Sequence, residues 1–191
     1  LMNMIYGIYY PDEGHIFVNG KEVTIRSPKD SYELGIGMVH QHFRLIPTLT
    51  AAENVFLYMP ECKFILNKKE MEEQIGKWSK EFHLDVEPSA LIWQLSVGEQ
   101  QRVEIVKLLC RGADILILDE PSAVLTAQEA KEMFHVLRRM ADSGKSVVVI
   151  SHKMNEVMGN NHYALSAVCH PAQHMEHFLC FLCGQNCGRL I

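Results

Sequence analysis

Short apolar runs alternate with longer stretches of helical spacing along the second half of the chain. Residues 115–118 and 147–150 are continuous apolar runs that end in polar residues, and residues 35–39 form a similar short run. Continuous apolar runs of this length are typical of strands buried on both faces of a parallel sheet. Between the later two runs, apolar residues recur on one helical face: Ala130, Met133, Phe134, Leu137, Met140 and Ala141. Strand, helix and strand joined by short links predict an α/β fold with a parallel sheet.

Turn and cap residues mark the ends of further elements. Asn19-Gly20, between residues 15–18 and 22–25, is a strong signal for a β-hairpin. Thr126 and Glu129 have the spacing of a capping box, and Gly144 supplies a stop for the helix that they begin. Residues 70–80 are rich in charge and predict an exposed helix.

Ser96 and Glu99 repeat the capping-box spacing ahead of a helix with an apolar side at Val103, Ile105, Val106, Leu108 and Leu109. One interpretation is an ordinary capped helix. The other is that Gly98 lets a phosphate approach the N-terminus of the helix, where free N–H groups and the dipole favour anions.

Composition narrows the possible partners. The 191 residues carry a formal net charge of −5, which gives no basic field for nucleic acid. No apolar run reaches the roughly 18 residues that a membrane helix needs, so we expect no direct membrane span. The start lacks the features of a signal peptide. The main part of the chain has few cysteines, as expected in a reducing cytoplasm.

Polar residues at the ends of the predicted strands suggest nucleotide chemistry. The run 115–118 ends in Asp119-Glu120, and the run 147–150 ends in Ser151-His152. Ligands of open α/β sheets sit at the carboxyl ends of strands. Asp119 can hold magnesium, and Glu120 can orient or deprotonate an attacking water. The simpler alternative is a strand that merely reaches solvent.

The order and spacing of these motifs resemble those of ABC ATPases over residues 1 to about 158. Leu95–Arg102 resembles the family signature, and residues 115–121 resemble the Walker B strand. Gly37–Gln41 looks like the Q-loop strand, and His152 like the switch histidine. The resemblance implies a P-loop NTPase (RecA-like) core formed by residues 1–41 and 114–158, with an inserted α-helical subdomain at 42–113.

The resemblance also implies roles for individual residues. Two such domains would hold ATP and Mg²⁺ between them, with Glu120 as the general base and His152 at the γ-phosphate. Asp119 and Gln41 would serve magnesium, and Gln41 would also sense the γ-phosphate. The remaining site residues would contact the ATP held by the second ABC ATPase domain: Ser96, Gly98 and Glu99.

Finer details resemble the importer branch for simple sugars and nucleosides. These are residues 39–43, 47–50 and 123–126, where Thr126 replaces the commoner Asp. The branch implies membrane permease subunits as partners and a location on the cytoplasmic face of the cell membrane. The alternative from another class is a soluble ABC-type protein with no role in transport.

Two parts depart from the family pattern. The Gly-rich Walker A loop would lie before Leu1 and is not in the chain, so we expect this chain alone to be inactive. Residues 159–191 lose the resemblance and become rich in Cys and His, which predicts a non-native tail. The rival interpretation is a zinc site formed by four residues: His177, Cys180, Cys183 and Cys187.

Overall fold

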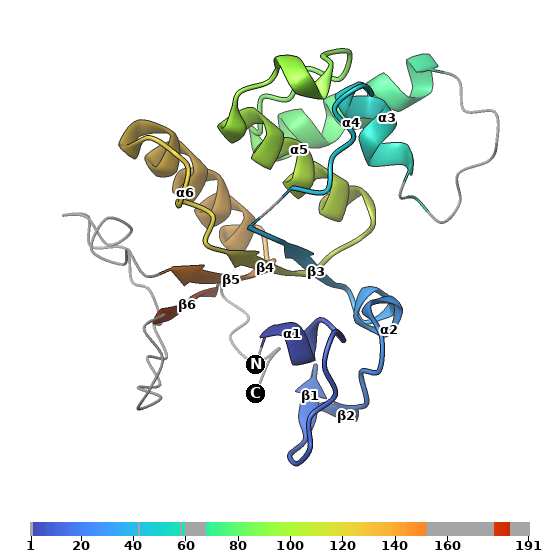
Figure 1. The fold of residues 1–191 in the computed structure, drawn as a ribbon, viewed down its shortest axis with the longest axis vertical. Helices are drawn as coiled ribbons and strands as arrows, with labels where there is room; N and C mark the ends of the chain where they lie inside the picture. The colour runs from blue at the N-terminus through green and yellow to red at the C-terminus, as the bar shows by residue number, and fades with distance from the viewer. Residues whose placement is uncertain (1, 42, 58, 60–67, 152–177, 184–191) are drawn as a thin grey trace.

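A twisted sheet of four strands organises the structure (Figure 1). The computed structural model describes residues 2–41, 43–57, 59, 68–151 and 178–183. Strands β3 (Ile36–Val39), β4 (Ile115–Asp119) and β5 (Ser146–Ser151) are parallel neighbours in that order. Strand β6 (Phe178–Cys183) pairs antiparallel with β5 along six residues. The predicted parallel α/β sheet is therefore confirmed.

Helices fill the connections between the parallel strands. The link from β3 to β4 contains α3 (Ala51–Leu57), α4 (Lys68–Phe82), the 3-10 turn η1 (Ile92–Gln94) and α5 (Val97–Cys110). Helix α6 (Ala127–Asp142) connects β4 to β5. Figure 1 shows α3, α4 and α5 grouped together beyond one end of the sheet.

Residues 2–35 form a small unit against the other face of the sheet. Helix α1 (Met2–Ile5) leads into a hairpin of β1 (Ile16–Val18) and β2 (Lys21–Val23), followed by α2 (Pro28–Glu33). The hairpin turns at Asn19-Gly20, whose φ angles are 53° and 74°. Two positive φ angles are what a two-residue type I′ turn requires, and this explains the Asn-Gly pair.

Alternate side chains of β4 supply two separate apolar cores. Leu116 and Leu118 pack with α5 and α6, whereas Ile115 and Ile117 pack with α1 and the hairpin. Successive strand residues point to opposite faces, and both faces of this strand are covered. Each such side chain contributes about 1.5–3 kcal/mol when fully buried, which is why the run contains no polar residue.

The expectation of an exposed helix at 70–80 needs correction. Helix α4 exists, but it is longer, and its residues Ile75 and Phe82 are buried in the core with α5. A helix with many charged residues still needs one apolar stripe to pack, and Met71 and Trp78 complete that stripe in α4.

Several expectations concern residues outside the described part of the chain. His177 and Cys187 of the proposed zinc set lie there, and so do most of residues 159–191. The division into core, insertion and tail therefore stays a prediction. Among the described residues, no helix is long and apolar enough to cross a membrane, and no cluster of three metal-ligating side chains occurs.

Candidate functional site

The carboxyl ends of β3, β4 and β5 lie at one edge of the sheet. Val39 pairs with Leu118, and Asp119 pairs with Ile150, so the three strands end at nearly the same level. Gln41 follows β3 by two residues and is exposed. Strand β5 ends at Ser151, and His152 lies outside the described residues. Gln41 and the Asp119-Glu120 pair therefore come from adjacent parallel strand ends.

Glu120 sits in an unusual backbone conformation directly after β4. Its φ is +49°, its N–H donates to the carbonyl of Ile150 at 2.9 Å, and its side chain is only 9% exposed. A positive φ is uncommon for a residue with a side chain, and such positions concentrate at functional sites. The sharp turn gives two consecutive carboxylates different surroundings, with Asp119 in the strand and Glu120 beyond it.

The capping box at the start of α5 has the predicted geometry. Glu99 Oε2 accepts from the Ser96 backbone N–H at 2.7 Å, and Ser96 Oγ accepts from the Glu99 N–H at 3.3 Å. The hydrogen bond from Ser96 lowers the pKa of the Glu99 carboxyl. The N–H groups of Val97 and Gly98 belong to the first turn, whose donors have no partner within a helix. This end of α5 therefore offers backbone donors to an anion.

Gly98 has a second structural reason besides the one expected from the sequence. A Cβ at this position would lie 3.3 Å from Oε1 of Glu129 and 3.6 Å from Leu125. Glu129 is itself part of the capping box that begins α6, because it accepts from the Thr126 N–H at 2.9 Å. The starts of α5 and α6 are thus neighbours, and Gly98 allows their close approach. Space for a phosphate at Gly98 stays a prediction.

A groove of about 600 Å³ joins Gln41 to the start of α5. Its lining includes Gln41, Phe43, Trp93, Val97 and Val124. The side chains of Trp93 and Val124 are 63% and 62% exposed, which is high for residues of this type. Of the six described site residues, only Gln41 lines this groove; the other five lie outside its lining: Ser96, Gly98, Glu99, Asp119 and Glu120.

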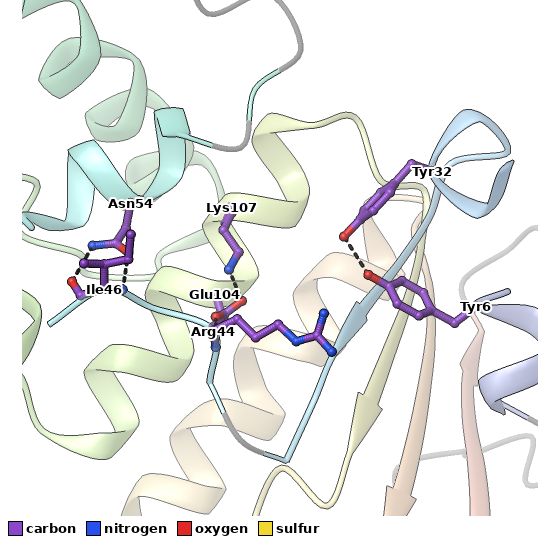
Figure 2. Close-up of polar contacts among 7 residues, drawn as sticks. All are labelled: Tyr6, Tyr32, Arg44, Ile46, Asn54, Glu104 and Lys107. Carbon is purple, nitrogen blue, oxygen red and sulfur yellow. Dashed lines mark hydrogen bonds and ion pairs between the residues drawn. The ribbon is translucent and has the colours of Figure 1, made fainter. Parts of the chain in front are cut away.

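Sequence reasoning missed a set of buried polar side chains on α3 and α5. Figure 2 shows Asn54, Glu104 and Lys107, which are 0%, 5% and 6% exposed. They sit among the apolar positions that predicted the helices, and the sequence pattern carried no signal for their partners. Gln101 on α5 and Ser122 after β4 are also buried, and each has a side-chain oxygen without a hydrogen-bond partner among the described residues.

Comparison with known proteins identifies the family of this chain. The family model described as "ABC transporter" matches residues 1–123, more than half of the chain. The chain belongs to the ABC transporter family. ATP hydrolysis is the characteristic activity of this family. The resemblance and the fold class expected from the sequence are both confirmed.

Two relatives have names that describe import. This chain is 48% identical over 158 residues to the "Nucleoside import ATP-binding protein NupA" of Lactococcus lactis subsp. cremoris (strain MG1363). It is 42% identical over 159 residues to the "Ribose import ATP-binding protein RbsA" of Caldanaerobacter subterraneus subsp. tengcongensis. Each alignment covers 82% of this chain, but only 31% and 32% of the relative. The chain thus spans about a third of the length of these relatives.

A solved ABC cassette has the same fold. The dimeric structure of a post-hydrolysis state of the ATP-binding cassette MJ0796, bound to ADP and Pi, is 28% identical with a TM-score of 0.64. The match covers 81% of this chain and 69% of the cassette. The structural agreement therefore extends over most of both chains.

Proposed function

We propose that this chain supplies the catalytic strand ends and the signature helix of an ATP-hydrolysing importer subunit. The observation that carries the proposal is the common sheet edge at which Gln41 and the Asp119-Glu120 pair lie. The capped start of α5, with its outward backbone donors, supports a second contact to a phosphate. Family membership supports ATP as the nucleotide.

Each residue has a role suited to its chemistry. Asp119 and Gln41 offer a carboxylate and an amide oxygen, which are ligands that Mg²⁺ prefers. The magnesium ion would neutralise developing charge on the phosphates. Glu120 would deprotonate or orient the attacking water, and His152, which follows β5 in the sequence, would contact the γ-phosphate. Most of the catalytic gain would come from positioning and electrostatics.

The first turn of α5 would act on a nucleotide held by another domain. Ser96, Gly98 and Glu99 lie in the half-exposed or exposed first turn, where a second surface can reach them. We propose that this surface is a second ABC ATPase domain, whose phosphate-binding loop carries the ATP. The dimeric form of the similar MJ0796 cassette supports this arrangement.

Import of a nucleoside or a simple sugar is the transport role that we propose. NupA and RbsA are named for nucleoside and ribose import, and the chain shares 48% and 42% identity with them. Membrane permease subunits would then be partners, and the protein would work at the cytoplasmic face of the membrane. A soluble ABC-type protein without a permease is the alternative, and it predicts no association with membranes that contain the permease.

The test joins these residues to a phosphate-binding loop, because the 191 residues contain no Gly-x₄-Gly-Lys-Ser/Thr sequence. Glu120→Gln in the joined protein should lower ATP turnover by about 10² to 10⁴ while ATP binding persists. This chain alone should release no phosphate, since the backbone and lysine contacts of the loop supply much of the phosphate binding.

The matched control is Glu73→Gln, at an exposed position of α4. The assignment of the base is wrong if Asp119→Asn or Glu73→Gln lowers turnover and Glu120→Gln does not. Magnesium-dependent turnover by the 191 residues alone, lost in Glu120→Gln, would contradict the need for the loop.

A further inference from the structure

Side chains of two helices hold the backbone of the segment that follows Gln41 (Figure 2). The N–H of Arg44 donates to Glu104 Oε1 at 2.9 Å. The N–H of Ile46 donates to Asn54 Oδ1 at 2.7 Å, and Asn54 Nδ2 donates back to the carbonyl of Ile46 at 3.1 Å. Asn54 lies in α3 and Glu104 lies in α5, so each helix holds one point of the segment.

Glu104 is fixed in turn by Lys107, one helical turn further along α5. Lys107 Nζ lies 2.6 Å from Glu104 Oε2, and both side chains are almost completely buried. Burial lowers the pKa of Lys107, and the charge of Glu104 opposes that shift. A buried ion pair contributes little net stability because desolvation offsets the attraction. Its value here is geometric, because it orients the second carboxylate oxygen toward the Arg44 N–H.

The surroundings of the pair are polar on one side. A small cavity of about 60 Å³ is bordered by His40, Arg44, Glu104, Lys107 and Arg111. The hydroxyl groups of Tyr6 and Tyr32 lie 2.7 Å apart. The guanidinium of Arg111 stacks on the ring of Tyr32. A cavity of this size with several polar groups in its lining has room for ordered water. Polar groups therefore surround the Glu104–Lys107 pair on the side that faces Arg44.

We propose that Glu104, oriented by Lys107, is a positioning residue that ties the segment carrying Gln41 to α5. The same helix begins with the capped turn at Ser96, about 12 Å away along its axis. Gln41 lies only three residues before the anchored Arg44. A shift of α5 thus moves both Ser96 and the backbone next to Gln41. Any effect of this contact on ATP hydrolysis rests on the proposed function, whereas the hydrogen bond between Arg44 and Glu104 does not.

The test is amide hydrogen exchange, measured by NMR on the full 191-residue chain without nucleotide. The decisive variant is Glu104→Met combined with Lys107→Met, because replacing both members of a buried ion pair by apolar groups of similar volume usually preserves the fold. Exchange at the Arg44 amide should become faster by about tenfold or more, as expected when a part-buried hydrogen bond that protects an amide is lost. The resonances of Gln41 and Phe43 should shift as well.

Two comparisons separate positioning from general destabilisation. Glu104→Gln combined with Lys107→Met keeps an acceptor oxygen at position 104 and leaves no buried lysine without Glu104, so it should restore the protection of the Arg44 amide. The Ile46 amide, which Asn54 holds, and the amides of β4 should keep their parent rates in the double variant. Glu73→Met with Lys77→Met, at two exposed positions of α4, is the matched control and should change none of these rates.

Unchanged exchange at Arg44 in the double variant would overturn the proposal. So would equal acceleration at Arg44, Ile46 and the β4 amides, because that pattern means global loosening. Since no nucleotide is present, failure of the proposed ATPase function would leave these rates as expected. Failure of the link would conversely leave the effect of Glu120→Gln on turnover intact, so the two outcomes can be told apart.

Discussion

Charged side chains have different partners at the start of α5 and further along the helix. At its start, Ser96 and Glu99 satisfy each other within three residues and remain partly exposed. Toward its end, Glu104 and Lys107 are buried, and Glu104 also holds the backbone of Arg44, sixty residues away in sequence. The start is a local structure, whereas the buried end depends on the whole fold.

This difference concerns both stability and function. The start can form as soon as the helix forms, because all its partners lie in one turn. The bond from Arg44 to Glu104 forms only when the segment after β3 packs against α5, because its two partners lie sixty residues apart in the sequence. We therefore expect substitutions at the buried end to have larger effects than substitutions at the start.

The largest effect is expected for Lys107→Met, which leaves Glu104 buried without its cation. Removal of one member of a buried ion pair costs about 3–5 kcal/mol. Urea denaturation of the purified chain should show this loss in the free energy of unfolding. The matched control is Lys131→Met, at an exposed position of α6, which should change stability by less than about 0.5 kcal/mol.

The double variant with Glu104→Met should recover most of the stability lost in Lys107→Met, because it leaves no uncompensated charge. If Lys107→Met instead matches the Lys131→Met control, then Glu104 and Lys107 are not a buried pair in solution. The contrast between the two ends of α5 would then disappear.

A smaller effect is expected for Ser96→Ala at the start of the same helix. Loss of an N-cap hydroxyl costs about 1 kcal/mol, within a range of roughly 0.5–2. Ser96→Gly should cost only a few tenths of a kcal/mol, since glycine is tolerated at the N-cap. Both values come from the same urea titration. A cost for Ser96→Ala as large as that of Lys107→Met would show that the start of α5 also has long-range partners.

The sequence predicted the features of this protein whose causes are local. The capping boxes at Ser96 and Thr126 have the expected geometry, and the Asn19-Gly20 turn has the expected positive φ angles. The strands around Leu116 and Val148 were also predicted, because short continuous apolar runs are typical of strands covered on both faces. Each of these signals lies within ten residues of the structure that it specifies.

Features that depend on distant parts of the chain were not predicted. The bond from Arg44 to Glu104 and the burial of Ile75 arise from packing between segments. The close approach of Glu129 to Gly98 requires α5 and α6 to be neighbours, which no local pattern states. The candidate site shows the same limit, because its strand ends were predicted one by one, whereas the groove from Gln41 to Val97 was not.

The smallest expected effect is the change in stability caused by Glu99→Gln at the start of α5, and it should depend on pH. The hydrogen bond from Ser96 holds the pKa of Glu99 below its usual value of 4.5 in the folded chain. A carboxyl with a lowered folded pKa stabilises the fold above its unfolded pKa, and this contribution is lost as the pH falls through the folded pKa.

Glu99→Gln keeps an acceptor but removes the charge from the start of the helix. The parent chain should therefore exceed Glu99→Gln in stability by about 0.3–1 kcal/mol at neutral pH. The difference should shrink as the pH falls below the usual value of 4.5 and vanish once the pH lies below the lowered pKa of the folded chain. Urea titrations at a series of pH values measure it, with Glu73→Gln as the control for a charge outside any cap. A difference that stays constant with pH would mean that shape, not charge, accounts for the role of Glu99 at this end of α5.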